Sequence, residues 1–254
     1  MSDILVGVCG FLGRMGAEVV RAVSDAEGMT FAGGADPQFQ GDGPEGAFCS
    51  ASVEEMLREV HPQVVVDFTV PAAAPGNIRA ALEAGAHCVV GTTGIAEDER
   101  ERLGELARSR NLGLLIAPNF AMGAVLMMRF AQEAARFFQG AEIIELHHDR
   151  KLDAPSGTAL MTADRVASSW SGSPGPGVGQ PSRGLDRGGV QIHSVRMPGF
   201  VAHQEVVFGN PGEVLTIRHD SLDRKSFMPG VILAIRRIRE QRGLVFGLEA
   251  LLFE

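Results

Sequence analysis

The 254-residue chain contains no tyrosine, and only two of its basic side chains are lysines, Lys151 and Lys225. The absence of tyrosine excludes every mechanism in which a tyrosine is the acid, including the Tyr-x-x-x-Lys chemistry of short-chain dehydrogenases. Because arginine supplies the other basic side chains, a lysine here needs a specific reason. An ammonium is a compact cation whose proton can be shared or transferred, so Lys151 is a candidate functional residue.

Cysteines and long apolar segments are also scarce. Cys9, Cys49 and Cys88 lie far apart and form no CxxC pair, which argues against a disulfide framework and against a thiolate zinc site. No apolar run approaches the length of a membrane span, and the N-terminus shows no secretory signal, so we expect a cytoplasmic protein without membrane contact. The formal charge of −8 argues against general nucleic-acid binding.

The first half of the chain alternates short β-branched runs with segments of helical periodicity. We expect buried strands at residues 4–9, 30–35, 64–68, 88–90 and 114–117, and helices at residues 15–26, 53–60, 72–84 and 97–110. Such a βαβ series predicts an α/β fold with a Rossmann-like parallel sheet, whose ligands lie beyond the carboxyl ends of the strands.

The pattern changes after Pro118 and predicts an α+β region with a mixed sheet. We expect helices at residues 122–138 and 157–170, strands at 142–147, 191–197, 203–208 and 214–219, and an irregular surface loop at 171–189. A closing helix at 227–241 and a strand at 244–248 can return to the first sheet. The predicted domains are therefore residues 1–119 with 227–254, which would bind a dinucleotide, and residues 120–226, which would bind the substrate.

A glycine-rich turn follows the first predicted strand. Gly10, Gly13 and Gly16 give the spacing G-x-x-G-x-x-G at the start of a helix, where a tight turn and free amides suit a pyrophosphate, and Arg14 adds a cation. Asp36, at the end of the second strand, can accept hydrogen bonds from both adenosine ribose hydroxyls. Its carboxylate disfavours a 2′-phosphate, which favours NADH, although Arg14 leaves NADPH open.

Two further strand ends are candidate cofactor contacts. Gly91, Thr92 and Thr93 are small enough to let the chain pass close to a flat ring, and residues 117–120 (Ala-Pro-Asn-Phe) can grip a carboxamide through backbone groups. Each segment can equally be a simple turn, and only their shared position at strand ends favours the functional interpretation.

The densest chemistry lies in E-L-H-H-D-R-K-L-D-A-P-S-G-T-A, residues 145–159, which leave a strand and enter a helix. Adjacent His147 and His148 point to opposite faces of the strand end, and imidazole can give a proton near neutral pH. No metal-binding spacing is present. Ser156 and Gly157 begin the helix, so beside Lys151 and His148 their amides can bind a small anion with more than one carboxylate, held opposite a nicotinamide.

This segment, together with G-F-L-G-R-M-G, V-G-T-T-G and A-P-N-F, resembles the 4-hydroxy-tetrahydrodipicolinate reductases, also called dihydrodipicolinate reductases, of lysine and diaminopimelate biosynthesis. The similarity spans nearly the whole chain. It implies NAD(P)H-dependent reduction of a cyclic imine diacid, a homotetramer assembled through the second sheet, and hinges near Asn119 and Phe227. The sequence departs from the family at Phe11 and Leu12, which are bulkier than the usual small residues.

The resemblance also assigns roles to individual positions. It implies that His147 is the proton donor and Lys151 a second acid. The positions that would hold the substrate carboxylates are His148, Lys151, Ser156, Gly157 and Thr158. The positions that would contact the cofactor are Gly10, Phe11, Leu12, Gly13, Arg14, Met15, Asp36, Gly91, Thr92, Thr93, Ala117, Pro118, Asn119 and Phe120.

Two other classes of protein remain as alternatives. Another nicotinamide-dependent enzyme, such as an amino-acid or homoserine dehydrogenase, would use the same fold with a different carbon as the hydride acceptor. A non-catalytic sensor that binds dinucleotide would need no proton donor beside the nicotinamide. Substrate screening separates the first alternative, and steady-state NADH oxidation separates the second.

Overall fold

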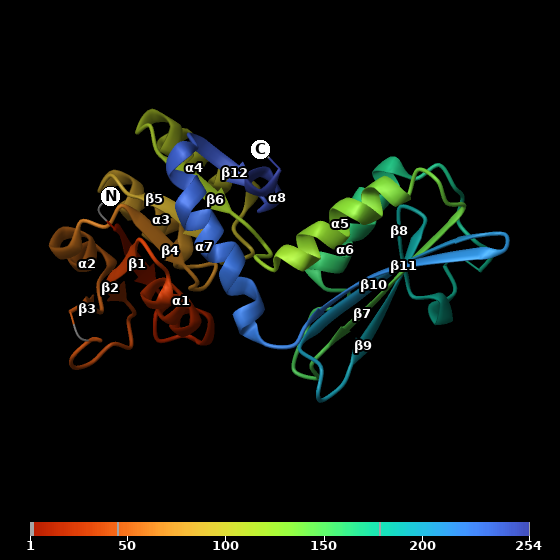
Figure 1. Ribbon diagram of the computed structural model, residues 1–254, viewed down its shortest axis with the longest axis horizontal. Helices are drawn as coiled ribbons and strands as arrows, with labels where there is room; N and C mark the ends of the chain where they lie inside the picture. Colours follow the sequence, from red (N-terminus) through yellow and green to blue (C-terminus); the bar gives the residue numbers. More distant parts are fainter. Residues whose placement is uncertain (1–2, 45, 178, 254) are drawn as a thin grey trace. The chain divides into compact units, whose positions relative to one another are not determined.

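The computed structural model describes residues 3–44, 46–177 and 179–253, and the chain divides into two compact units. Unit 1 comprises Met1–Phe120 with Phe227–Glu254, and unit 2 comprises Ala121–Ser226. The ends of the predicted first domain, at residues 1 and 254, and residue 178 of the predicted loop lie outside the described residues. Each unit has its own sheet and its own helices (Figure 1).

Unit 1 contains a seven-stranded sheet in the order β12-β6-β5-β4-β1-β2-β3, and every pairing in it is parallel. The strands are β1 (Ile4–Cys9), β2 (Met29–Ala35), β3 (Phe48–Ser50), β4 (Val64–Asp67), β5 (His87–Val90), β6 (Gly113–Ile116) and β12 (Gly243–Phe246). The predicted Rossmann-like α/β fold is confirmed, including the return of the C-terminal strand to the first sheet.

Helices cover both faces of this sheet (Figure 1). They are α1 (Arg14–Asp25), α2 (Val53–Val60), α3 (Ala74–Glu83), α4 (Glu97–Ser109), α7 (Met228–Arg237) and the short α8 (Glu249–Leu252). Helix α1 contacts α7, whereas α3 contacts both α2 and α4. The central strands β4 and β6 are buried at every residue, as expected for apolar strands between two helical layers.

Unit 2 contains a mixed five-stranded sheet in the order β11-β10-β7-β9-β8. Its strands are β7 (Gly140–His147), β8 (Leu185–Arg187), β9 (Val190–Arg196), β10 (Ala202–Asn210) and β11 (Glu213–Ser221). Only β7 and β9 run parallel, and the other neighbours are antiparallel. The helices α5 (Met122–Ala134) and α6 (Gly157–Ser169) contact each other and pack on the sheet, so the predicted mixed α+β arrangement is confirmed.

Five short elements differ from the sequence-based expectation. The irregular loop predicted at residues 171–189 contains a 3-10 turn, Pro181–Arg183, and the edge strand β8, so its prediction as wholly irregular was wrong. Strand β3 and helix α8 were not predicted, and α7 ends at Arg237 before a separate 3-10 turn. All are short, and β8 is exposed at each of its residues, so hydrophobic periodicity carries no signal for it. None of the helices described is long and apolar enough to cross a membrane.

Candidate functional site

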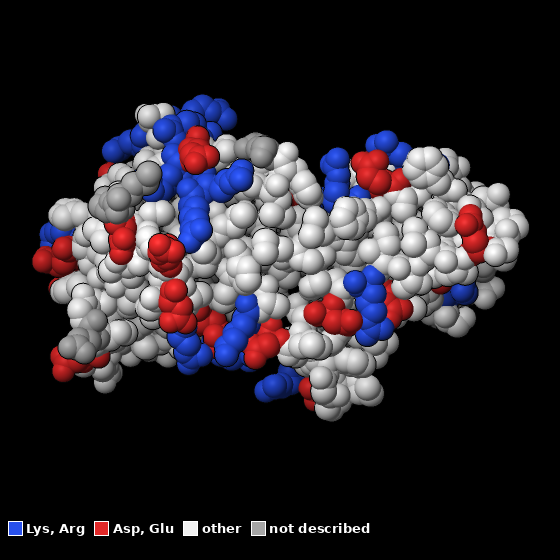
Figure 2. Space-filling view, in the orientation of Figure 1, with Lys and Arg blue, Asp and Glu red and all other residues white. Residues whose placement is uncertain are grey.

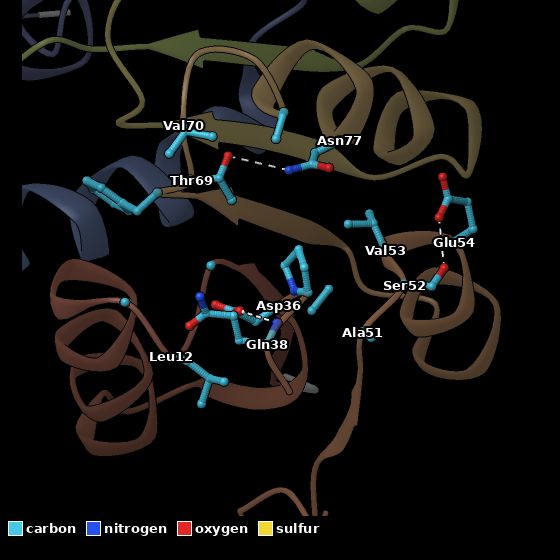
Figure 3. Close-up of a pocket in the computed structure, with 16 residues that line it drawn as sticks. Leu12, Asp36, Gln38, Ala51, Ser52, Val53, Glu54, Thr69, Val70 and Asn77 are labelled. Atoms are coloured by element: carbon cyan, nitrogen blue, oxygen red, sulfur yellow. Dashed lines mark hydrogen bonds between the residues drawn. The ribbon is translucent and has the colours of Figure 1, made fainter. Parts of the chain in front are cut away.

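A cavity of about 680 Å³ opens at the carboxyl ends of the unit 1 strands (Figure 3). Among the predicted cofactor residues, Gly10, Leu12, Gly13 and Asp36 line it. The other lining residues come from the ends of β2 and β4 and from the starts of α2 and α3, and they include Ser52, Glu54, Thr69 and Asn77. The cavity therefore occupies the position at which parallel sheets of this type bind ligands.

The glycines of the first turn are required by close backbone contacts. Gly10 has a φ of +78°, and a Cβ there would lie 2.8 Å from the carbonyl oxygen of Phe68. A Cβ at Gly16 would lie only 2.0 Å from the carbonyl oxygen of Gly10, so this glycine lets α1 pack against the turn. Helix α1 begins after Gly13, and no side chain caps it. Its first amides are therefore suited to an anion such as a pyrophosphate.

The bulky residues at positions 11 and 12 do not fill the cavity beside the glycine-rich turn. Phe11 is buried, its ring lies 5.5 Å from that of Phe39, and a Cβ at Gly34 would lie 2.6 Å from the same ring. Phe11 thus occupies space that a side chain at position 34 would fill, and it is absent from the cavity lining. Leu12 is half-exposed at the cavity wall. Arg14 and Met15, at the start of α1, are likewise absent from the lining.

Two carboxylates face the cavity. Asp36 follows β2, and its Oδ1 accepts a hydrogen bond from the amide of Gln38 at 3.0 Å. Ser52 caps α2 by accepting from the amide of Glu55 at 3.2 Å, and its hydroxyl donates to Glu54 at 2.8 Å (Figure 3). The backbone amide of Glu54 and the Ser52 hydroxyl lower the pKa of Glu54. The described lining contains no Lys or Arg, so the cavity wall is acidic.

The strand ends after β5 and β6 do not line this cavity. Thr92, Thr93 and Pro118 line a separate cavity of about 70 Å³. A Cβ at Gly91 would lie 2.0 Å from the ring of Phe68, so this glycine makes room for an aromatic side chain of the protein itself. Ala117 and Phe120 are buried, and the Phe120 ring lies 5.6 Å from that of Phe68, whereas Asn119 is half-buried.

In unit 2 a buried carboxylate gathers several donors beside the predicted catalytic histidine. Glu145 on β7 is fully buried, and Arg196 on β9 donates to both of its oxygens, at 2.9 and 2.7 Å. The ring of His147 donates from Nδ1 to Glu145 Oε2, and the amide of Ser156 donates to Oε1 at 3.3 Å. Because Nδ1 must carry a proton to make this contact, Nε2 is the ring nitrogen that remains for a ligand.

The electrostatics of this cluster favour an ionised Glu145. Burial alone would raise the pKa of Glu145, but the hydrogen bonds from His147 and Arg196 outweigh burial and lower the pKa to about 2. Arg196 also donates to the carbonyl oxygen of Asp153 at 2.6 Å, which ties the loop after β7 to the same carboxylate. The position of His147 is thus set by a carboxylate, Glu145, that remains ionised across the neutral range.

The predicted carboxylate-binding residues lie in the loop after β7 and at the start of α6. Ser156 caps this helix by accepting from the amide of Ala159 at 3.2 Å, and Gly157 and Thr158 supply its first amides. The Lys151 amide donates to the His148 carbonyl at 3.1 Å, which forms a turn between two of the predicted ligands. The Ser156 amide donates to Glu145, so it is not free for a substrate. A contact between Ser156 and a substrate would therefore use the Ser156 hydroxyl, and the amides of Gly157 and Thr158 would take the place of the Ser156 amide.

The loop after β7 contains an ion pair and a histidine whose pKa is lowered. The ammonium of Lys151 lies 2.7 Å from a carboxylate oxygen of Asp153. The pKa of His148 is lowered, first by burial and then by positive charges that include Arg150 and Arg224. The buried Nδ1 of His148 has no hydrogen-bond partner among the residues described here. No group of three or more His, Cys, Asp or Glu in the described chain is arranged to hold a metal ion.

Family models cover almost all of both units. The model for the N-terminus of dihydrodipicolinate reductase matches residues 4–120, and the model for its C-terminus matches residues 123–252. The chain belongs to the dihydrodipicolinate reductase family. Members of this family use a nicotinamide cofactor.

Individual dihydrodipicolinate reductases are similar along their whole length. The 4-hydroxy-tetrahydrodipicolinate reductase of Moorella thermoacetica is 45% identical over 99% of both chains. The enzyme of Listeria welshimeri is 48% identical over 97% of this chain and 99% of its own. A dipicolinate-bound dihydrodipicolinate reductase from Paenisporosarcina sp. TG-14 matches with a TM-score of 0.88 and 39% identity, over 98% of this chain and 99% of that one.

A more distant likeness concerns the fold alone. An amine dehydrogenase of Mycobacterium smegmatis has a TM-score of 0.68 at 15% identity.

Sequence reasoning missed residues that support the predicted ones from a distance. Glu145 stands in the quoted segment but received no role, although a charged residue inside an apolar strand is a detectable signal. Arg196 lies 51 residues from Glu145, a pairing that only the fold of the second sheet reveals. Arg224, which lowers the pKa of His148, and Asp67, a buried acid that ends β4, were also missed.

Proposed function

We propose that this protein is an NAD(P)H-dependent reductase that converts 4-hydroxy-tetrahydrodipicolinate to tetrahydrodipicolinate in lysine and diaminopimelate biosynthesis. The observation that carries the proposal is the ionised Glu145–Arg196 pair that orients His147 beside the start of α6. Binding of dipicolinate by the Paenisporosarcina relative supports a small dicarboxylate substrate.

The residues of unit 1 fit a dinucleotide. The close contacts at Gly10 and Gly16 and the uncapped start of α1 suit a pyrophosphate. The acidic wall at Asp36 suits a ribose. Gly10, Leu12 and Gly13 would flank the pyrophosphate, and Asp36 would accept hydrogen bonds from the ribose hydroxyls. When bound, the reduced nicotinamide supplies a hydride to the substrate.

The chain itself supplies the proton and neutralises the negative charge of the substrate. After loss of the 4-hydroxyl group, reduction adds a hydride at C4 and a proton at the neighbouring carbon of the ring. His147 would give this proton from Nε2, while Glu145 holds the ring through Nδ1. Lys151 would act as a second acid and counter the carboxylates, and the amides of Gly157 and Thr158 would bind them at the start of α6. His148 and the Ser156 hydroxyl complete the proposed carboxylate site.

NADH is the proposed cofactor rather than NADPH. Asp36 and Glu54 both line the cavity, and a 2′-phosphate there would meet two carboxylates without a cation from the described lining. Figure 2 shows that Lys and Arg side chains of unit 1 gather instead over α4 and the C-terminal end of α7, where Arg236, Arg239 and Arg242 are exposed. Titration of the protein with each cofactor, followed by cofactor fluorescence, tests this proposal, and tighter binding of NADPH contradicts it.

We also propose a cytoplasmic homotetramer that closes over its ligands. The face of the second sheet opposite Glu145 carries half-buried Ile144 and Leu146, and at the edge of the same sheet Val214 and Leu215 are exposed, which supports burial of this sheet against other copies. The proposed hinges near Asn119 and Phe227 adjoin the two places where the chain passes between units. Analytical ultracentrifugation tests the tetramer, because a monomer at micromolar concentration contradicts it.

Steady-state oxidation of NADH by the purified protein, with the cyclic imine diacid as substrate, tests the reaction directly. We expect turnover with this substrate, and no reduction of NAD+ when amino acids or homoserine are offered as hydride donors. NADH binding without turnover of any of these substrates would instead favour a sensor. Lys151→Arg separates a proton-sharing cation from a generic charge, because a guanidinium retains the charge but gives up no proton. Parent-like turnover of this variant contradicts an acid role for Lys151.

A further inference from the structure

The buried carboxylate of Asp67 has no part in the reaction proposed above. Asp67 is the last residue of β4, follows three buried valines, and is only 1% exposed. Burying an acidic side chain is costly unless hydrogen bonds replace its lost hydration. The partners of Asp67 therefore show what the chain gains by keeping this residue at the cavity edge.

Four hydrogen bonds converge on this carboxylate. Oδ1 accepts from the amide of Thr69 at 3.1 Å, from the hydroxyl of Thr69 at 2.8 Å and from the hydroxyl of Thr92 at 2.6 Å. Oδ2 accepts from the side-chain amide of Asn77 at 2.8 Å. None of these donors is a cation, so the arrangement is a hub of hydrogen bonds and not a salt bridge.

The donors come from three separate segments at the same edge of the sheet. Thr69 belongs to the loop after β4, Asn77 lies in α3, and Thr92 lies in the loop after β5. Thr69 and Asn77 line the larger cavity, where Figure 3 shows them facing each other. Thr92 lines the smaller cavity of about 70 Å³. One carboxylate thus fixes walls of both cavities.

We propose that Asp67 is a positioning residue for the cofactor, acting through Thr69, Asn77 and Thr92. This inference rests on the proposed binding of a dinucleotide at the same edge. A carboxylate offers acceptors to several donors at once, so it holds two loops and helix α3 in one arrangement before the cofactor arrives. An apolar side chain at this position would pack equally well but would leave the three donors without their partner.

The test compares three variants by NADH affinity and by turnover. Asp67→Asn keeps the size of the side chain but sets an amide group against the donor of Asn77, and Thr92→Val removes one hydroxyl from the hub. We expect each to raise the Kd and the KM for NADH by about tenfold, which corresponds to about 1.4 kcal/mol, with kcat at saturating NADH within about twofold of the parent. The double variant should have a Kd for NADH at most about threefold above the higher of the two single-variant Kd values. The reason is that both changes break the same network.

Thr30→Val is the matched control, since it removes a hydroxyl that donates to Asp3 at 3.2 Å in the same unit. It should leave the Kd for NADH unchanged. A lower melting temperature of Asp67→Asn with parent-like NADH affinity would show a purely structural role and overturn the proposal. Additive effects of Asp67→Asn and Thr92→Val on affinity would also overturn it.

Two further outcomes are separated by the same experiment. If Asp67→Asn does not fold, Thr92→Val alone must weaken NADH binding, and parent-like affinity of that variant overturns the proposal. If the parent protein binds neither NADH nor NADPH, the proposed reductase function fails together with this inference. Parent binding combined with parent-like binding of all variants overturns the positioning role alone.

Discussion

The two units build their candidate sites from different materials. In unit 1 the cavity is shaped by glycines, strand ends and uncapped amides, with Asp36 and Glu54 at its wall. In unit 2 the site is organised by an ionised carboxylate, Glu145, that is fully buried and held by Arg196. Backbone groups suit the binding of a cofactor, which requires a fixed position and no proton transfer from the protein. Side chains with exchangeable protons suit the chemical step.

This contrast predicts a division of effects between mutations. Changes in unit 1 should alter cofactor affinity and selectivity with little effect on the chemical step. Changes in the Glu145 cluster should alter turnover, stability and pH dependence with little effect on the affinity for NADH.

The largest effect is expected for His147→Gln. Loss of a positioned acid should lower kcat by about a hundredfold to ten-thousandfold, while the Kd for NADH stays at the parent value. Steady-state NADH oxidation and a fluorescence titration measure the two quantities. His61→Asn is the control, because this exposed histidine ends α2 in a left-handed conformation that asparagine tolerates. Unchanged turnover of His147→Gln removes His147 from the mechanism.

Glu145→Gln should reduce both stability and turnover. Removing one partner of a buried pair leaves Arg196 without its counter-charge, which costs about 3 to 5 kcal/mol of unfolding free energy. Thermal or urea unfolding measures this loss. Glu205→Gln, on β10, breaks a partly exposed pair with Arg218 on β11 and should cost much less stability. Equal losses in the two variants would contradict the distinction between the buried network and the surface pair.

Asp36→Asn should shift cofactor selectivity toward NADPH. Removing one carboxylate weakens both the acceptance of ribose hydroxyls and the repulsion of a 2′-phosphate, so we expect the NADH-to-NADPH affinity ratio to fall by about tenfold. Titrations with both cofactors give the ratio. Asp25→Asn, which removes the same charge from the exposed end of α1, should leave the ratio unchanged. A similar fall in both variants would indicate a general charge effect.

Acid should destabilise the protein in a range set by Glu145. Its pKa falls from the usual 4.5 to about 2 on folding, so between these values the unfolded chain binds more protons than the folded chain. The stabilisation is complete above about pH 4.5 and is lost as the pH falls toward 2. Thermal unfolding across this range measures the decline, which should be shallower for Glu145→Gln. An identical slope in the variant would show that other carboxyl groups dominate.

The sequence predicts the parallel sheet well and singles out a candidate catalytic segment, because both depend on local patterns. Buried strands such as β4 and β6 are continuous apolar runs, and the predicted N-cap of α6 at Ser156 follows from its own short motif. Strand β8 could not be predicted, because its three exposed residues acquire their structure only by pairing with β9.

The supporting residues of the candidate site are harder to predict than the residues proposed to be catalytic. His147 and Lys151 stand out by residue type and spacing. Arg196 and Asp67 act only through contacts that folding creates: Arg196 with Glu145 across the sheet, and Asp67 with two loops and helix α3 at a strand end. Ser156 shows the converse, since its amide is already used by Glu145 and is lost to the predicted substrate contact.

The ring of Phe11 lies over Gly34, so the residues allowed at these two positions, 23 residues apart, depend on each other. A methyl group at position 34 would lie 2.6 Å from the ring and displace it, whereas a small residue at position 11 would leave a void beside Gly34. A substitution at either position therefore requires a compensating substitution at the other. Grafting the turn of a relative into this chain would succeed only if position 34 were grafted with it.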